Sequence, residues 1–236
     1  MKSLVLVSAL ALSSFALAAA EPNTLTPQEK ADGWKLLFDG KSLTGWRNFK
    51  KKEPPKQGWV AEDGILKKVA AVNGGDIITD QTFDDFDLEW DWNISPKGNN
   101  GIKYFITEDR SSAIGHEYQM IDDEGNPDGK VGPKHQTASF YDVLPPKADK
   151  PPSKPGEWNH SRVLVLGNHV EHWLNGAKVL EYELGSDLVK TEVAKSKFKN
   201  VAGFGTHIQG HILLTDHHDE CSFRNIKIRE LRRPGK

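Results

Sequence analysis

Alternation of apolar and polar residues over nine positions constrains the fold of this chain more than any other feature. In FDLEWDWNI, residues 86–94, every second side chain is apolar, and the side chains between them carry a carboxylate or an amide group. A period of two is typical of a β-strand in a sheet with one buried and one polar face. Helical periodicity is confined to SDLVKTEVAKSKF (186–198), where Ser186 can cap a short helix and Val189 and Val193 share one face.

Most of the remaining chain also has the pattern of short strands separated by turn-forming residues. Ten further strands are predicted at 34–38, 64–69, 101–107, 116–121, 137–143, 162–167, 169–174, 178–184, 211–217 and 221–228. Many short strands at close spacing predict an all-β sandwich or barrel. The proline-rich segment 144–157 has no periodicity and is predicted to be a long loop, functional or disordered.

The N-terminus has the pattern of an export signal. Residues 1–20 are an apolar run headed by Lys2 and ending in three alanines, which is typical of a cleaved secretory signal peptide. We therefore expect an exported protein, periplasmic or extracellular, that begins near Glu21. Residues 21–30 are predicted to be a linker, and residues 31–232 a single domain with no later membrane span.

Charge and cysteine content exclude some classes of function. The formal net charge is −2 with both signs interspersed, which gives no indication of binding to nucleic acid or to a membrane surface. Cys221 is the single cysteine, so no intramolecular disulfide can form, and a free cysteine in a strand is usually a small buried apolar residue.

Pairing the strand at 86–94 with residues 100–107 as a hairpin gives a consistent register. Trp92 then lies opposite Ile102 on the buried face. The same register places Asp91 opposite Lys103, and Glu89 opposite Phe105, on the polar face. We therefore expect an Asp91–Lys103 neighbour pair on an open sheet face.

Two other strands add polar side chains to that face. In 116–121, Tyr118 and Met120 are predicted to point inward, and Glu117 and Gln119 outward. In 211–217, Ile212 and Leu214 are predicted to be core, while the opposite face carries His211, Leu213, Thr215 and His217.

The residues after Leu214 are assigned mainly to structure. Asp216 falls on the inward side and is expected to pair with Arg224, away from the open face. Asp219 and Glu220 are expected to form a hairpin turn. His217 is the functional candidate of this stretch, and His211 a weaker one.

Together the polar residues of the open face can form the floor of a sugar site: Glu89, Asp91, Lys103, Glu117, Gln119 and His217. Each residue alone is better interpreted as part of a solvated face, where a cross-strand ion pair contributes a few tenths of a kcal/mol, and only the set as a whole favours a site. The paired-carboxylate strand of sandwich-fold glucanases is incomplete here, because its last position is Ile94, which points into the core.

Seven motifs in order resemble a known family. They are WKLLFDGKSLTGW (34–46), GNNGIKY (98–104), EYQMIDD (117–123), TASFYD (137–142), GEWNH (156–160), HWLNG (172–176) and FRNIKI (223–228). They resemble the 3-keto-disaccharide hydrolase domain family over residues 31–232. The resemblance implies a concanavalin A-like lectin/glucanase jelly roll, that is, two curved antiparallel sheets with a concave carbohydrate-binding face.

The resemblance also implies a reaction. A ketone at carbon 3 of a glycoside acidifies the proton on carbon 2, a base removes it, the group at carbon 1 is expelled, and water adds back. Such chemistry needs one base and a cation or hydrogen-bond donor at the carbonyl oxygen. His217 or Glu117 is the candidate base; Lys103, or a divalent metal held by Glu117 and His217, would stabilise the enolate. The expected substrate-binding residues are Gln119, Asp91, Glu89, Tyr141, Trp158, His211 and Thr215.

Some positions depart from the family pattern. Thr215 stands where the family carries Gln, His218 where it carries Gly, Asn100 where it carries Ser, and Gln136 where it tends to carry Arg. A non-catalytic sugar-binding module and a structural cell-surface domain therefore remain alternatives to the enzyme.

Overall fold

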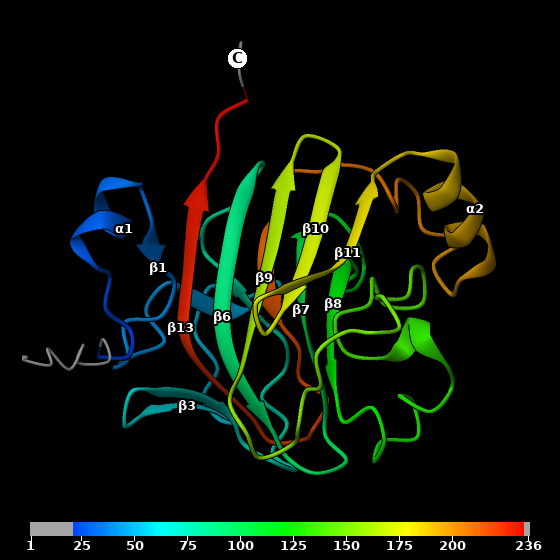
Figure 1. Cartoon of the computed structure of the whole chain (residues 1–236). Coiled ribbons are helices and arrows are strands. Elements are labelled where there is room, and N and C mark those ends of the chain that lie inside the picture. The colour runs from blue at the N-terminus through cyan, green and yellow to red at the C-terminus, as the bar shows by residue number, and fades with distance from the viewer. Residues whose placement is uncertain (1–20, 234–236) are drawn as a thin grey trace, which may run out of the picture.

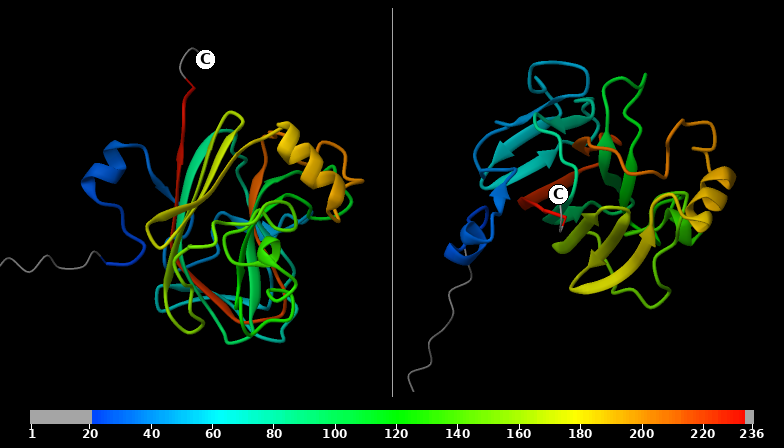
Figure 2. Two further views of the ribbon diagram at one scale, coloured as in Figure 1. Left: turned by 45° about the vertical axis from the view of Figure 1, so that its right-hand side comes forward. Right: turned by 90° about the horizontal axis from the view of Figure 1, so that it is seen from above.

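The computed structural model describes residues 21–233 as a sandwich of two antiparallel sheets, so the predicted fold class is confirmed. The predicted signal peptide lies outside the described residues. The eight-stranded sheet has the order β11-β10-β9-β6-β13-β4-β3, with β1 paired to β13, and the five-stranded sheet has the order β2-β5-β12-β7-β8. Figure 1 looks onto the eight-stranded sheet, and Figure 2 shows the two layers.

The eight-stranded sheet is formed by β1 (Lys35–Leu36), β3 (Trp59–Glu62), β4 (Ile65–Lys68), β6 (Phe86–Ile94), β9 (Asn159–Leu166), β10 (His169–Leu174), β11 (Ala177–Glu183) and β13 (Cys221–Glu230). The five-stranded sheet is formed by β2 (Trp46–Asn48), β5 (Ile77–Thr79), β7 (Asn99–Ile106), β8 (His116–Ile121) and β12 (His211–Leu214). The short strands β2, β3 and β5 were not predicted. The predicted strand at 137–143 is wrong: it is a series of turns with isolated bridges at Phe140.

Three helices accompany the sheets in the described part of the chain. Ser186 caps α2 (Asp187–Lys195), which buries Val189 and Val193 as predicted. The region expected to be a linker contains α1 (Pro27–Ala31), whose N-terminus is capped by a capping box of Thr26 and Glu29. A 3₁₀ turn, η1 (Pro133–His135), lies in the long segment after β8. With five and nine residues, α1 and α2 fall far short of a membrane span.

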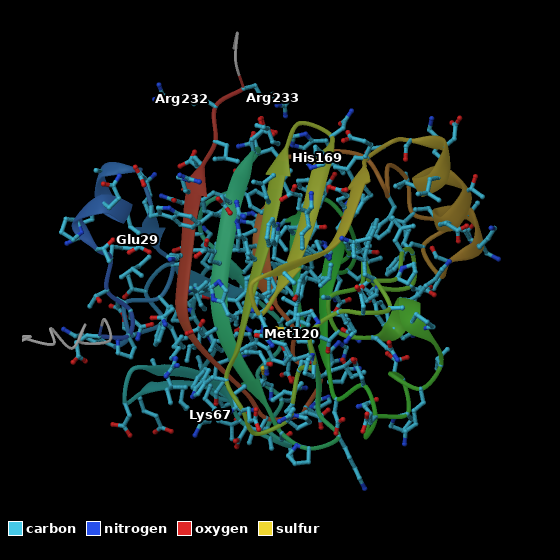
Figure 3. All side chains as sticks on the ribbon, in the orientation of Figure 1. Glu29, Lys67, Met120, His169, Arg232 and Arg233 are labelled. Carbon is cyan, nitrogen blue, oxygen red and sulfur yellow. The ribbon has the colours of Figure 1, made fainter. Side chains whose placement is uncertain are left out.

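Large aromatic side chains fill the space between the sheets. Trp90 packs edge-on against Tyr118, and its indole N–H contacts the sulfur of Met120, which is fully buried and is labelled near the centre of Figure 3. Ser161 Oγ bonds the indole of Trp92 and the hydroxyl of Tyr118, both at 2.8 Å. These contacts join β6 and β9 of one sheet to β8 of the other, so the inward residues were assigned correctly.

The predicted hairpin between residues 86–94 and 100–107 is wrong. The chain crosses from one sheet to the other after β6, so β6 pairs with β9 and β13, and β7 pairs with β8 and β12. Trp92 and Ile102 are both buried, but in opposite layers. Asp91 and Lys103 consequently lie on opposite outer faces of the sandwich, because alternation fixes which side of a sheet a residue faces but not which sheet it belongs to.

Candidate active site

An acid and a base lie side by side on the outer face of the five-stranded sheet, called the site face below. Glu117 on β8 is the direct cross-strand partner of Lys103 on β7. The Lys103 Nζ lies 4.0 Å from the Glu117 Oε2, and the two side chains are 17% and 6% exposed. Alternation accounts for their position, since Tyr118 and Ile102 next to them point into the core.

Gly101 provides the space that the Glu117 carboxylate occupies. A Cβ on Gly101 would come within 2.2 Å of the Glu117 Oε1. Gly101 pairs with Gln119 on β8, and its carbonyl accepts the Thr215 N–H at 3.1 Å. A glycine inside a strand often marks such a close approach. Gly101 belongs to the GNNGIKY motif, but nothing in the sequence around it predicts this role.

Three acceptor atoms around Gly101 have no hydrogen-bond partner in the described structure: Glu117 Oε1, Gln119 Oε1 and Thr215 Oγ1. The Gln119 Nε2 donates to the Asn99 Oδ1 at 3.3 Å. The Gln119 Oε1 therefore points away from Asn99. Buried acceptors are normally paired, and leaving one unpaired costs about 1–3 kcal/mol. The hydroxyls of a polyol are suitable donors for such a group.

A cleft of about 320 Å³ opens over Lys103 and Glu117. Its first wall is the connection between β7 and β8 at residues 113–115, and its second wall contains Lys197, Phe198 and Val201, which follow α2. Figure 1 shows α2 beside β11 at the edge of the sandwich, and the residues that follow α2 form this side of the cleft. The second wall was not predicted, because nothing in its sequence suggests proximity to β8.

Tyr141 adjoins Glu117 from the turns after η1. Its backbone N–H donates to the Glu117 carbonyl at 3.1 Å, and its hydroxyl donates to Asp128 at 2.9 Å. His135 binds the other oxygen of Asp128, and the Lys197 ammonium lies 4.2 Å from the centre of the Tyr141 ring. Burial and the bond to Asp128 raise the pKa of Tyr141, so its phenol remains protonated.

Three of the expected substrate-binding residues lie on the outer face of the eight-stranded sheet, called the network face below. Asp91 accepts hydrogen bonds from His160 at 2.9 Å and Asn225 at 2.7 Å. Burial raises the pKa of Asp91, but these bonds outweigh it and hold the pKa below its usual value. Glu89 pairs with Lys227 at 2.9 Å, and Arg224 covers the ring of Trp158 at 4.1 Å. Asp91, Glu89 and Trp158 are therefore separated from Glu117 by the whole sandwich.

His211 lies on the site face, as predicted, but at the far end of β12 from Thr215. It is buried, and its Nδ1 lies 2.7 Å from the Thr79 carbonyl oxygen. Its Nε2 lies 3.8 Å from Glu108, whose pKa is lowered to about 2, chiefly by hydrogen bonds from Arg47. This histidine thus belongs to a local polar cluster at the sheet end.

His217 is exposed in the loop that follows β12, two residues beyond Thr215. The strand ends at Leu214, so alternation does not extend to His217. The strand ends here because the neighbouring Asp216 is held by other contacts. Its carboxylate accepts hydrogen bonds from the N–H groups of Gly74 and Gly75 at 2.7 and 2.8 Å and pairs with buried Lys68 at 3.0 Å.

Two predictions for this stretch are wrong. Asp216 does not pair with Arg224, since Arg224 lies on the network face with Asp91. Residues 219–220 form no hairpin, because β12 and β13 belong to different sheets. The backbone of His218 has φ 68°, a conformation that favours glycine, which the family pattern carries there.

Two groups among the described residues could hold a metal ion, and neither contains Glu117 or His217: Asp84, Asp85 and His207, and His169, Glu171 and Glu181. Arg233 already binds Asp85, and Lys178 binds Glu171 and Glu181. Figure 3 shows His169 on the eight-stranded sheet, away from the site face. At Glu117 the Lys103 ammonium already supplies a positive charge, so this donor set is a poor fit for a divalent cation shared with His217.

Comparisons with known proteins show which family this chain is similar to. Residues 33–229 match the family described as the 3-keto-alpha-glucoside-1,2-lyase-like domain. A relative from Bacteroides thetaiotaomicron named 3-keto-disaccharide hydrolase is 34% identical over 92% of this chain and 85% of its own.

Two crystal structures of candidate glycosyl hydrolases from Parabacteroides distasonis share the fold. One is 34% identical, with a TM-score of 0.81, and the match covers 90% of this chain and 100% of that structure. The other is 29% identical, with a TM-score of 0.67, and the match covers 84% of this chain and 99% of that structure. The chain belongs to the 3-keto-alpha-glucoside-1,2-lyase-like family, as its motifs indicated, and is an enzyme of the hydrolase type.

Proposed function

We propose that this enzyme cleaves 3-keto-glycosides at the site face, with Glu117 as the base and Lys103 as the charge that stabilises the enolate. The observation that carries the proposal is the Glu117 carboxylate. It is buried, one of its oxygens has no hydrogen-bond partner among the described residues, and the other faces an ammonium group across a cleft floor. Membership of a family with a 3-keto-disaccharide hydrolase supports the substrate class.

The chemistry follows from the ketone. Glu117 removes the proton on carbon 2, and the electron pair of that C–H bond moves into the C2–C3 bond while the carbonyl oxygen becomes an enolate. The Lys103 ammonium stabilises this developing negative charge. The enolate then reforms the ketone, a C1–C2 double bond forms, and the C1–O bond breaks with its electron pair on the leaving oxygen, which takes up a proton. Water adds back, with hydroxide at carbon 1 and a proton at carbon 2, so the net reaction is hydrolysis.

Hydrogen-bond acceptors beside Glu117 would hold the sugar ring. Gln119 and Thr215 flank Gly101 on either side, and each has a buried side-chain oxygen with no partner within residues 21–233. Hydroxyl groups of the keto sugar can donate to these oxygens, which would orient carbon 2 toward the carboxylate. Glu117 replaces His217 as the proposed base, since the structure places His217 in an exposed loop.

Substitution of the base tests the proposal. Glu117→Gln keeps the size of the side chain but removes the basic oxygen, so kcat on a 3-keto-disaccharide is expected to fall by about a hundredfold or more with little change in KM. Release of free sugar measures it. Glu157→Gln, at an exposed glutamate, is the matched control. A Glu117→Gln enzyme with wild-type kcat would rule out this base.

We also propose that the enzyme acts outside the cytoplasm. The support is the apolar run at residues 1–20, headed by Lys2 and ending in alanines. The intact mass of the secreted protein should correspond to a chain that begins near Glu21; a mature form that keeps Met1 would contradict export with cleavage.

A further inference from the structure

The site face changes in polarity on either side of Glu117. Toward the start of β7 lie Asn99, Gln119 and Thr215, which offer hydrogen-bond acceptors. Toward the other end, Leu213 is the cross-strand neighbour of Lys103, and Ile78 and Ile106 pack with it in a small apolar cluster. The catalytic pair thus stands at the boundary between a polar end and an apolar end.

The cleft opens on the apolar side of this boundary. Its walls contain Ala113, Ile114, Phe198 and Val201, and its polar groups are Lys197, Lys103 and Glu117. Phe198 stacks on Phe204 with ring centres 4.2 Å apart and an interplanar angle of 12°. Ile114 and Val201 pack against the main core. The apolar surface is therefore held in place by the core rather than by a free loop.

A second sugar is poorly suited to such a wall. A hexose brings several hydroxyl groups, and each one buried without a partner costs free energy. An aromatic or alkyl group has no such requirement and gains from the removal of apolar surface from water. The volume of about 320 Å³ is ample, given that an apolar cavity of about 150 Å³ holds benzene.

We propose that this cleft receives the leaving group of a 3-keto-glycoside and takes aromatic or alkyl alcohols in preference to a second sugar. The proposal rests on the function proposed above. It names Ile114 and Val201 as residues that determine leaving-group specificity, while the keto sugar occupies the polar end beside Gln119 and Thr215.

Two substrates with primary-alcohol leaving groups test the preference, so that leaving-group acidity is similar. One is benzyl 3-keto-glucoside, and the other is the disaccharide in which a second glucose is attached through its primary hydroxyl. For the wild-type enzyme, kcat/KM for the benzyl compound should be about tenfold higher or more. An equal value, or a higher one for the disaccharide, would overturn the proposal.

Variants of the wall locate the preference. Val201→Thr keeps the shape of the side chain and adds a hydroxyl, so kcat/KM for the benzyl compound should fall about fivefold while that for the disaccharide is unchanged. Val131→Thr, at a valine that is 68% exposed outside the cleft, should change neither. An equal fall for both substrates in Val201→Thr would contradict a role in specificity.

Binding separates this inference from the proposed function. If neither compound is cleaved, the proposed function fails, and calorimetry with the unoxidised benzyl glucoside and the unoxidised disaccharide then decides about the cleft. Tighter binding of the benzyl glucoside that Val201→Thr weakens would support an apolar subsite. Equal binding of the two, or no effect of the variant, would overturn it.

Discussion

The two outer faces of the sandwich carry the same kinds of residue, but they differ in how well their carboxylates are paired. On the network face, Asp87 accepts bonds from Arg162 at 2.5 and 2.9 Å and from Arg229 at 2.9 Å. On the site face, Glu117 has a charged neighbour at 4.0 Å and an oxygen to which no other described residue donates a hydrogen bond. A fully paired carboxylate stabilises a fold, whereas an incompletely paired one is available to a ligand.

The largest expected difference between the faces concerns turnover. Lys103→Met removes the positive charge at the enolate, and kcat should fall by roughly a hundredfold. Lys103→Arg keeps the charge and should recover part of the loss. The initial rate of sugar release measures both, and thermal unfolding should show that both variants are folded. Wild-type kcat in Lys103→Met would place the stabilising charge elsewhere.

Treatment with a metal chelator tests whether Lys103 or a bound metal ion supplies the positive charge at the enolate. Since Lys103 faces Glu117 directly, turnover of the wild-type enzyme should be unchanged after treatment with a chelator. If activity were lost and then restored by added Mn²⁺ or Ca²⁺, an ion rather than Lys103 would supply the charge at the enolate.

On the network face, substitution of a paired carboxylate should lower stability rather than turnover. Asp87 is 1% exposed, and Asp87→Asn would weaken two arginine contacts at once. The free energy of unfolding should fall by about 1–3 kcal/mol, measured in denaturant, with kcat of the folded enzyme unchanged. A loss of kcat at full stability would mean that the network face takes part in catalysis.

Much of the fold could be predicted because burial parity is a local property. The inward positions of Trp90, Tyr118, Met120 and Ile212 follow from alternation alone and are confirmed. The assignment of strands to sheets could not be predicted in the same way, since a chain that crosses between sheets after β6 has the same alternation as a hairpin. This single ambiguity placed Asp91 opposite Lys103, and Glu89 on the same face.

The candidate site was predicted in part for the same reason. Glu117, Gln119 and Lys103 lie on regular strands, so their shared face could be derived. His217 lies beyond the end of β12, where the hydrogen bonds that Asp216 accepts from Gly74 and Gly75 in a distant loop decide the path of the chain. Phe198 and Val201 reach the cleft through tertiary packing after α2, which leaves no local pattern.

A smaller effect is expected from pH on the network face. Glu29 anchors α1 to the sheet through Lys227, and hydrogen bonds from Lys227 lower the pKa of Glu29 from 4.5 to about 2. Because the folded pKa is below the unfolded one, this stabilisation is present above about pH 5 and is lost as the pH falls toward 2.

Glu29→Gln should therefore reduce stability by about 1 kcal/mol at pH 7, given screening by solvent, and by less at pH 3. Thermal unfolding at the two pH values measures the difference. Glu220→Gln, at an exposed glutamate, is the control. An equal loss at both pH values would show that packing rather than charge holds α1.

The smallest expected effect is at His217. Its side chain is exposed beyond β12, and surface substitutions away from packed or bonded features usually change free energies by less than about 0.5 kcal/mol. His217→Gln should accordingly keep kcat within about twofold of the wild type, while Glu117→Gln loses it. If instead His217→Gln lost a hundredfold in kcat with unchanged stability, the loop after β12 would have to close over the site face during turnover. The imidazole would then share the role of base with Glu117.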